Sequence, residues 1–258
     1  MKIKLYLEFF DDLRNLINSE SHKGKTVLIY EKNPNPPKFF EQLRIKVELD
    51  KHKDIILEDE TSLELGGIKR KSFSLIYPSS NLDFINHIKN GRITLIGLES
   101  KEILDVSTDF GMIILIGVKN ISEKDYESLK QFNLISNGIE GFLIRTIPRK
   151  FWCRISKNIR PYFSFEFLGN AIFYLYKQRF KDLIGMMEIF FINSYSDLID
   201  EIIELSSKIT IAQNKKWLKK IEEWKKRIDC DYDWACEICP YQEDCYDIKK
   251  LLSTRNKM

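Results

Sequence analysis

Four of the chain's five cysteines lie within sixteen residues, in the segment CDYDWACEICPYQEDC. They are spaced Cys-x5-Cys-x2-Cys-x5-Cys, as Cys230, Cys236, Cys239 and Cys245. A Cys-x2-Cys pair lets one turn present two thiolates to one metal centre, and a loop on each side can bring in the other two. Four thiolates suit a tetrahedral zinc ion or a cubane iron–sulfur cluster. The spacing therefore predicts a metal centre.

Three features favour an iron–sulfur cluster over zinc. The segment has one central Cys-x2-Cys pair, whereas zinc sites usually have two separated pairs. Pro240 directly follows Cys239, as prolines often follow cluster ligands. The stretch CEICPYQEDC also resembles the Cys-x2-Cys-Pro-Tyr element of iron–sulfur-stabilised nucleases and of auxiliary clusters in radical enzymes. We expect a [4Fe–4S] cluster, with zinc and free or disulfide-bonded thiols as the alternatives.

A cluster held by four cysteines would leave no iron open to a substrate, which favours electron transfer or a structural role. From Asp229 to Asp247 the chain has seven acids and no Lys or Arg. This negative charge should lower the reduction potential of an anionic cluster. The fifth cysteine, Cys153, falls in an expected strand, and we interpret it as a small buried apolar residue.

No other residues form a catalytic constellation, and we assign no catalytic residue. His22, His52 and His87 are scattered along the chain. Neither a Gly-x-Ser-x-Gly motif nor a dinucleotide fingerprint is present. The stretch Gly24-Lys25-Thr26 resembles the end of a phosphate-binding loop. That interpretation fails because a strand follows it where the motif requires a helix.

Composition indicates an ordinary globular chain, with 43% apolar residues, 31% charged residues and a net charge of +3 over 258 residues. So small a net charge gives no reason to expect nucleic acid as a partner. No apolar run reaches about 18 residues, so we expect no membrane span. The start, MKIKLYLEFFDDL, is too broken for a signal peptide. We expect a cytoplasmic protein, where clustered cysteines are more often metal ligands than disulfides.

The middle of the chain is predicted to be rich in strands. Short apolar runs with β-branched and aromatic residues alternate with Gly, Asn and Ser between residues 61 and 147. One helix, SEKDYESLKQF, interrupts them. Upstream, KTVLIYE predicts a further strand, and Pro34, Pro36 and Pro37 predict an irregular loop after it. The expected strands of the middle region are SFSLIY, RITLIGL, GMIILIGV and GFLIRTI.

From residue 150 the pattern becomes strand, helix, strand, helix. FWCRIS and GMMEIFFIN predict the strands, and SFEFLGNAIFYLYKQRF and SDLIDEIIELSSKI predict the helices. Short links between them predict a βαβα unit with a parallel strand pair joined by a crossover helix. The fold class is therefore α/β, or mixed α+β.

A basic helix is predicted before the cysteine segment, in NKKWLKKIEEWKKRI. Trp217, Ile221, Trp224 and Ile228 share one stripe of it, and lysines and arginines fill the other faces. It can be a surface helix docked through its tryptophans or a basic arm for an acidic partner. We leave both interpretations open.

Several segments, in the same order along the chain, resemble the acetyl-CoA synthase (beta) subunit of the carbon monoxide dehydrogenase/acetyl-CoA synthase complex. The most specific is FWCRISKNIRPYFSFEFLGNAIFYLYKQRF, which looks like that family's Trp-x-Arg-Ile-Ser-Lys strand and following helix. The resemblance covers about residues 61–210. The other segments are SLELGGIKRKSFSLI, GRITLIG, FGMIILIGV, NGIEGF and EIFFINSYSDLIDEI.

The resemblance implies a site beside Trp152 and Arg154, which match the family's pattern next to its cofactor region. We expect these two residues to contact a cofactor; the alternative is a packed Trp and a surface Arg on a structural strand. The family makes acetyl-CoA at a nickel–iron–sulfur centre that needs further, widely spaced cysteines. This chain has only the compact four-cysteine segment there, and Ile144 stands about where the family has a histidine.

These observations predict three regions: an N-terminal segment of unclear structure (1–60), a synthase-like α/β domain (61–212) and a basic helix with the metal segment (213–258). We expect a [4Fe–4S]-binding relative without acetyl-CoA synthase activity. It would act in electron transfer or metal and cluster assembly in anaerobic one-carbon metabolism, with a protein partner from a related complex. The alternatives are a divergent synthase subunit, which would be an enzyme, or a zinc-stabilised interaction protein.

Overall fold

The computed structural model describes most of the chain up to residue 207. The described residues are 11–16, 24–52, 54–67, 69–119, 122, 125, 128–129, 137–147 and 150–207. The chain divides into two compact units, residues 1–206 and 207–258. The four clustered cysteines, the predicted basic helix and most of the helix expected in SEKDYESLKQF lie outside the described residues.

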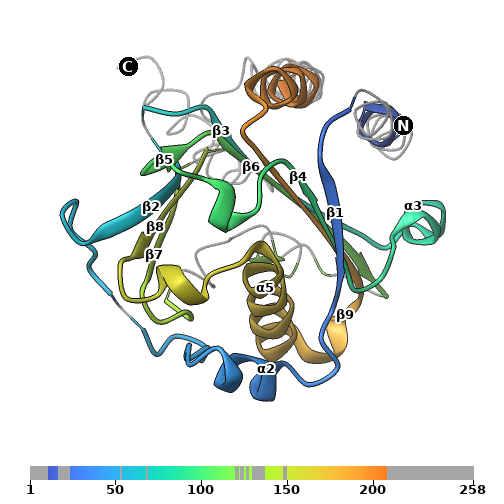
Figure 1. Ribbon diagram of the computed structural model, residues 1–258. Helices are drawn as coiled ribbons and strands as arrows, with labels where there is room; N and C mark the ends of the chain where they lie inside the picture. Colours follow the sequence, from blue (N-terminus) through green and yellow to red (C-terminus); the bar gives the residue numbers. More distant parts are fainter. Residues whose placement is uncertain are drawn as a thin grey trace, which may run out of the picture. The chain divides into compact units, whose positions relative to one another are not determined.

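Two β-sheets form the framework of the first unit (Figure 1). The five-stranded sheet has the order β1-β4-β9-β6-β3, in which β4 and β9, and β3 and β6, run parallel. Its other neighbours run antiparallel. Its strands are β1 (Val27–Glu31), β3 (Ser72–Ser79), β4 (Arg92–Ile96), β6 (Phe110–Val118) and β9 (Ile184–Asn193).

The four-stranded sheet has the order β5-β2-β8-β7. The short strand β5 runs parallel to β2, and the remaining pairs are antiparallel. Its strands are β2 (Thr61–Gly66), β5 (Ser107–Thr108), β7 (Phe142–Ile147) and β8 (Lys150–Ser156). The named helices are α2 (Pro36–Gln42), α3 (Leu82–His87), α5 (Phe165–Phe180), η1 (Ser100–Glu102), η3 (Arg160–Tyr162) and η4 (Lys181–Leu183). Residues 11–16 and 196–207 are also helical.

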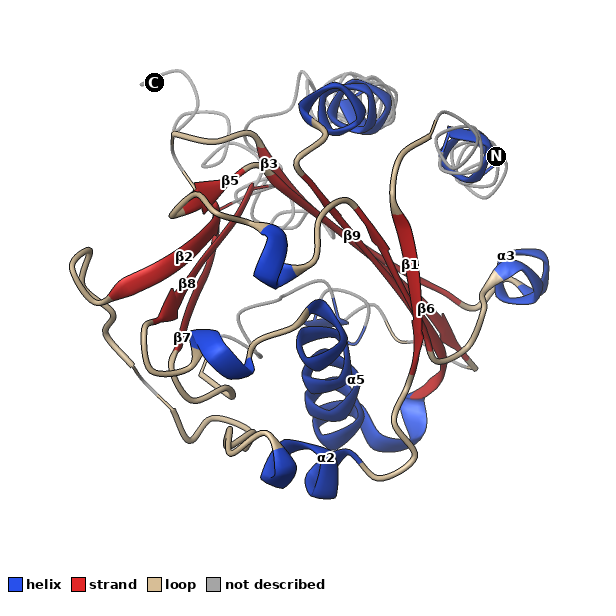
Figure 2. Ribbon diagram, viewed as in Figure 1, coloured by secondary structure: helices blue, strands red, loops and turns tan. Residues whose placement is uncertain are grey.

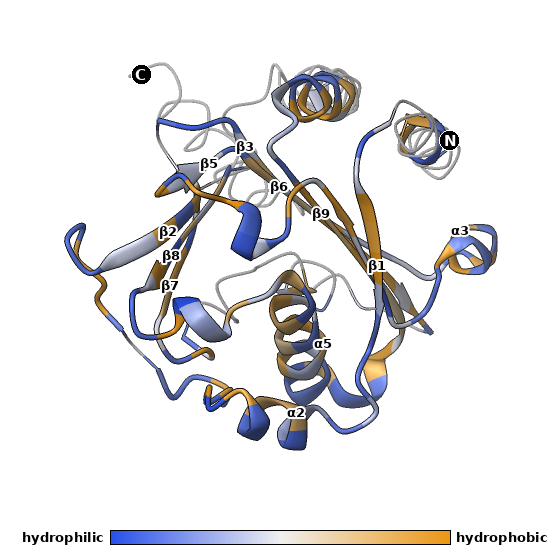
Figure 3. Ribbon diagram, viewed as in Figure 1, coloured by the Kyte–Doolittle hydropathy of each residue, from blue (hydrophilic) through white to orange (hydrophobic). Residues whose placement is uncertain are grey.

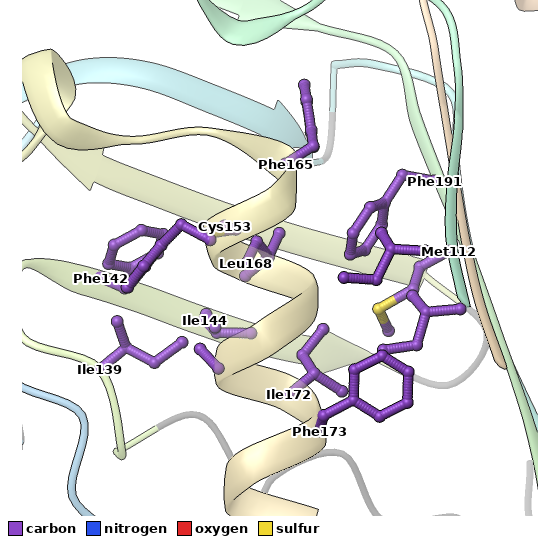
Figure 4. Packing of buried hydrophobic residues seen from close by; sticks show 14 of the residues in the cluster. Met112, Ile139, Phe142, Ile144, Cys153, Phe165, Leu168, Ile172, Phe173 and Phe191 are labelled. Carbon is purple, nitrogen blue, oxygen red and sulfur yellow. The ribbon is translucent and has the colours of Figure 1, made fainter. Parts of the chain in front are cut away.

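Helix α5 lies between the two sheets (Figures 1 and 2). It begins at Ser164, whose Oγ accepts a hydrogen bond from Phe167 N at 3.0 Å. Ten of its sixteen residues are buried, because a helix enclosed on most sides must be apolar on most sides. Figure 4 shows its Leu168 and Ile172 packed between the inner residues of the two sheets.

The predicted strands of the middle region are confirmed as β3, β4, β6 and β7, and the mixed fold class is confirmed. The order strand, helix, strand, helix after residue 150 is also confirmed. The predicted parallel pair is wrong, because β8 belongs to the four-stranded sheet and β9 to the five-stranded sheet. Helix α5 therefore fills the space between two sheets and does not cross over one of them.

The expected irregular loop at Pro36 and Pro37 is also wrong, since these residues open helix α2. Proline is tolerated in the first turn because its missing N–H would have no partner inside the helix. Asn35 caps the helix by accepting a hydrogen bond from Lys38 N at 3.3 Å. Residues before position 61 thus belong to the fold: β1 pairs with β4, and Phe40 lies in the core.

The five-stranded sheet is covered on both faces. Its outer side carries the helices of residues 11–16 and 196–207 together with α3 (Figure 2). Leu13, Phe84 and Leu198 of these helices are buried. Figure 3 shows the strands of this sheet as mostly hydrophobic. No helix among the described residues is long and apolar enough to cross a membrane.

Candidate surface site on the four-stranded sheet

Strand β8 places the two residues expected to contact a cofactor on the outer face of the four-stranded sheet. Phe151, Cys153 and Ile155 are buried on its inner face. Trp152 and Arg154 alternate with them and therefore face outward. Cross-strand neighbours share a face of a sheet, so the register defines the rest of this surface. Arg145 and Gly66 flank Trp152, and Leu143 and Glu64 flank Arg154.

Arg154 is held by three contacts on this face. Its Nε donates a hydrogen bond to Glu64 Oε2 at 2.9 Å, and its Nη1 donates to the Ile56 carbonyl oxygen at 3.2 Å. Its guanidinium lies 5.0 Å from the centre of the Trp152 ring, within the range of a cation–π interaction. The geometry thus fixes a guanidinium and an indole side by side.

Two glycines at the end of β2 shape the surroundings of Trp152. Gly66 has φ +69°, and a Cβ there would lie 2.3 Å from the Phe151 carbonyl oxygen. Gly67 has φ +107°, and a Cβ there would lie 3.0 Å from both Trp152 Cδ1 and Glu64 Oε1. Its N–H donates to the Phe151 carbonyl at 3.0 Å. A side chain at either position would displace the indole or the strand that carries it.

Exposed apolar residues lie along the edges of the same surface. Ile56 is buried, whereas its neighbours Ile55 and Leu57 are 79% and 56% exposed. Val106 is 61% exposed, and its carbonyl oxygen accepts a hydrogen bond from Glu64 N at 2.6 Å. Hydrogen bonds therefore connect the segment 55–57 to Arg154 and Val106 to Glu64. We call the surface formed by Glu64, Arg145, Lys150, Trp152 and Arg154, with Ile55, Leu57 and Val106 at its rim, the Trp–Arg face.

The strand residues at the centre of the Trp–Arg face are predominantly cationic, whereas the exposed acids Glu58, Asp59 and Asp105 adjoin its rim. Lys150 shares the outward side of β8 with Trp152 and Arg154, and Arg145 lies 6.0 Å from the Trp152 ring centre. Glu64 is the one acidic side chain among the outward residues of the described strands of this sheet. On the adjoining turn, Arg70 Nε donates to Ser107 Oγ at 3.0 Å. The cofactor contact expected of Trp152 and Arg154 stays a prediction, because their described contacts are all within the protein.

Cys153 has its thiol in the core between the sheets. It is 0% exposed, and burial raises the pKa of its thiol, with the charge of Glu64 adding to the shift. A thiol that is buried among apolar residues is inert as a nucleophile. The prediction that Cys153 is a buried apolar residue is confirmed.

A second group of ionisable residues lies around the start of α5. The Tyr30 hydroxyl donates to Glu99 Oε1 at 2.5 Å, and burial together with Glu99 raises the pKa of Tyr30. Burial and Glu99 also raise the pKa of Glu166. Glu99 and Glu102 form a capping box on η1. Among the described residues, no group of three or more His, Cys, Asp or Glu is placed to hold a metal ion.

Sequence reasoning named Trp152 and Arg154 but missed the residues that contact them. Glu64 and Ile56 lie 90 and 98 positions before Arg154 in sequence, whereas Arg145 lies on the adjoining strand β7. One signal was available, because TSLELG alternates polar and apolar residues as a half-buried strand does. The four cysteines lie outside the described residues, so their ligand set stays a prediction.

The family model described as CO dehydrogenase/acetyl-CoA synthase complex beta subunit matches residues 45–198. That stretch includes nearly all of both sheets and all of α5. One curated relative is the acetyl-CoA decarbonylase/synthase complex subunit beta of Methanopyrus kandleri, which is 26% identical over 120 residues. The match covers 45% of this chain and 24% of that protein, so the chain matches about a quarter of the relative's length.

Proposed function

The chain belongs to the CO dehydrogenase/acetyl-CoA synthase complex beta subunit family, and from that premise we propose that it is a [4Fe–4S]-binding member without acetyl-CoA synthase activity. Cys230, Cys236, Cys239 and Cys245 would hold the cluster. Its role would be electron transfer, or metal and cluster assembly, within anaerobic one-carbon metabolism. Subunits of a related complex would be its partners.

The number and spacing of the cysteines are the observation that supports this proposal most directly. The chain has five cysteines, and Cys153 lies in the apolar core, where no group of potential metal ligands surrounds it among the described residues. Four remain, and they are the four with cluster-like spacing. Four thiolates complete the ligation of one cubane. None of the five is left to bind nickel beside it, so the synthesis of acetyl-CoA would need further ligands.

Metal and sulfide analysis of anaerobically purified full-length protein tests this proposal. We expect about four irons and four sulfides per chain, the content of one cubane, with a broad brown absorption that bleaches on reduction. Nickel in addition to that iron, together with acetyl-exchange activity, would instead identify a divergent synthase subunit. One colourless zinc per chain would identify an interaction protein with a structural metal.

Single substitutions of the central pair identify the ligands. Cys236→Ser or Cys239→Ser should remove most of the iron and the visible absorption, because each deletes one of four thiolate ligands. The matched control is Cys153→Ala, which removes the thiol in the core and should leave iron and sulfide unchanged. Loss of the cluster from Cys153→Ala but not from Cys236→Ser would contradict the assigned ligands.

A further inference from the structure

The two sheets differ in what covers their outer faces. Helices cover the outer side of the five-stranded sheet, whereas no helix among the described residues lies on the side of the four-stranded sheet opposite α5 (Figure 2). That side carries the Trp–Arg face. We propose that the Trp–Arg face is a docking surface for an acidic, leucine- or aromatic-bearing segment of a partner protein. The proposal does not depend on the metal content of the chain.

The centre of the face has the side chains that dominate protein–protein contacts. Trp and Arg are enriched among interface residues that contribute most to affinity, and they act best when held rigidly. Trp152 lies against the guanidinium groups of Arg145 and Arg154, and Arg154 is held by Glu64 and the Ile56 carbonyl. These side chains therefore have little conformational freedom left to lose on binding.

The rim of the face supplies apolar area next to this centre. Ile55, Leu57 and Val106 are each more than half exposed. The Ile56 carbonyl oxygen accepts a hydrogen bond from Arg154, and the Val106 carbonyl oxygen accepts one from Glu64 N. These two hydrogen bonds fix the backbone next to the apolar side chains of the rim. Apolar side chains gathered on such an exposed surface are typical of an interaction site. A partner segment that carries leucine or aromatic side chains would remove this area from water.

The cationic side chains at the centre of the face favour an acidic segment there, while the exposed acids Glu58, Asp59 and Asp105 adjoin only the rim. Arg145, Lys150 and Arg154 face outward, and Glu64 is the one acid among them. Glu64 is already paired with Arg154. Carboxylates of a partner would meet Arg145 and Lys150, whereas a basic partner would be repelled.

The extent of the face favours a protein segment over a small molecule. Its residues span the sheet from β7 to the edge beyond β2. At ~4.8 Å between neighbouring strands, that distance is roughly 15 Å. An extended peptide of about ten residues crosses it easily at ~3.3 Å per residue, whereas a small ligand would contact part of it.

Binding of defined peptides to the full-length protein tests this proposal. The probe is a fluorescein-labelled peptide of alternating Asp and Leu, about ten residues long to cross the sheet, and its counterpart has Lys in place of Asp. Fluorescence anisotropy measures both. We expect saturable binding of the acidic peptide, weakened by salt, and binding of the basic peptide that is at least about tenfold weaker.

Substitutions on the face and away from it locate the site. Arg145→Glu should weaken acidic-peptide binding by about tenfold or more, and Leu57→Asp and Val106→Asp should weaken it as well. The matched controls are Lys38→Glu on α2 and Leu82→Asp on α3, where Leu82 is 72% exposed. Both controls should bind like the wild type. All five positions are at the surface, and circular dichroism confirms that each variant is folded.

Four results would overturn the proposal. They are equal binding of the two peptides, no saturable binding up to about 1 mM, equal losses in the control variants, and competition by ADP with no effect of the rim substitutions. The last result would identify a small-ligand site at Trp152 and Arg154. Failure of peptide binding leaves the iron analysis untouched, and absence of iron leaves the peptide result untouched, because the two experiments depend on different residues.

Discussion

Interior strands of the two sheets differ in their burial pattern. In β6 of the five-stranded sheet, all nine residues of FGMIILIGV are buried. In β8 of the four-stranded sheet, buried residues alternate with exposed or half-buried ones. A continuous apolar run is required where both faces are covered, and alternation is required where one face meets water. Among the described residues, the pattern therefore identifies the four-stranded sheet as the one with an outward face that no helix covers.

The polar side chains of the two sheets also differ in where they point: inward, to the backbone of loops, in the five-stranded sheet, and outward in the four-stranded sheet. In β9, Asn193 exchanges hydrogen bonds with the backbone of Leu98 at 2.8 and 2.9 Å, and Glu188 accepts from Lys89 N at 2.9 Å. Both are buried, and their hydrogen bonds tie a neighbouring loop to the sheet. The polar groups of the Trp–Arg face point outward. Substitutions of these polar groups should thus affect stability in the first sheet and binding in the second.

The largest stability effect is expected in the five-stranded sheet. Phe191 is fully buried, and its ring centre lies 5.8 and 5.7 Å from those of Phe110 and Phe165. Phe191→Ala should lower the free energy of unfolding by about 3–5 kcal/mol, because it leaves a cavity in a packed core. Urea denaturation measures this. Leu57→Ala, at the rim of the Trp–Arg face, should change the free energy of unfolding by less than about 0.5 kcal/mol. Equal effects of the two substitutions would contradict the difference drawn between the two sheets.

The next effect is expected at Gly66, the last residue of β2 in the four-stranded sheet. Gly66→Ala should cost about 2–4 kcal/mol, because a positive φ is strained for alanine and the new Cβ meets the Phe151 carbonyl. Gly24→Ala is the matched control, with φ +78° and nothing within 4 Å of the new Cβ. It should cost only about 1 kcal/mol from the φ strain. Equal losses in urea denaturation would show that the contact with Phe151 relaxes freely.

A smaller, pH-dependent effect is expected at the buried carboxyl of the five-stranded sheet. Burial raises the pKa of Glu188, although the Lys89 N–H and Arg14 oppose the shift. A raised pKa in the folded state means that its contribution to stability is present at acidic pH and is lost as the pH rises through that pKa. Glu188→Gln removes this loss. The variant should be more stable than the wild type at neutral pH, by on the order of 1 kcal/mol.

The measurement for Glu188→Gln is the difference in unfolding free energy from the wild type, at neutral pH and at a pH below the ordinary carboxyl pKa. The difference should be larger at neutral pH, because only there must the folded wild type bury a charge. A variant that is less stable than the wild type at neutral pH would show that the Arg14–Glu188 pair, at 3.3 Å, is net stabilising.

Local sequence patterns predicted the elements better than their partners. The strands β6 and β8 and the helix α5 could be recognised because their patterns depend on residues close in the chain. Assignment of β8 and β9 to one sheet failed because pairing is decided by long-range packing around α5, which no local pattern encodes. Pro36 was misjudged because a proline in the first turn of a helix looks like a loop signal until the cap at Asn35 is known.

In the candidate site, too, single residues could be predicted from the sequence but their long-range contacts could not. Trp152 and Arg154 could be named because a family resemblance covers their strand, and Cys153 because it is a lone cysteine in an apolar run. The contact between Arg154 and Glu64 joins residues 90 positions apart, and such a contact depends on strand register. Register is set by the whole sheet, so neither this pair nor the rim residue Val106 could be derived from the sequence.

The smallest stability effect, and the sharpest separation of the two sheets, is expected at Arg145. Its side chain is exposed, and its described contact is a cation–π interaction with Trp152 at 6.0 Å. Arg145→Ala should therefore change the free energy of unfolding by less than about 0.5 kcal/mol. The same substitution should weaken acidic-peptide binding severalfold, because it removes a cation from the Trp–Arg face. A large loss of stability without a loss of binding would mean that this face, like the five-stranded sheet, serves the fold alone.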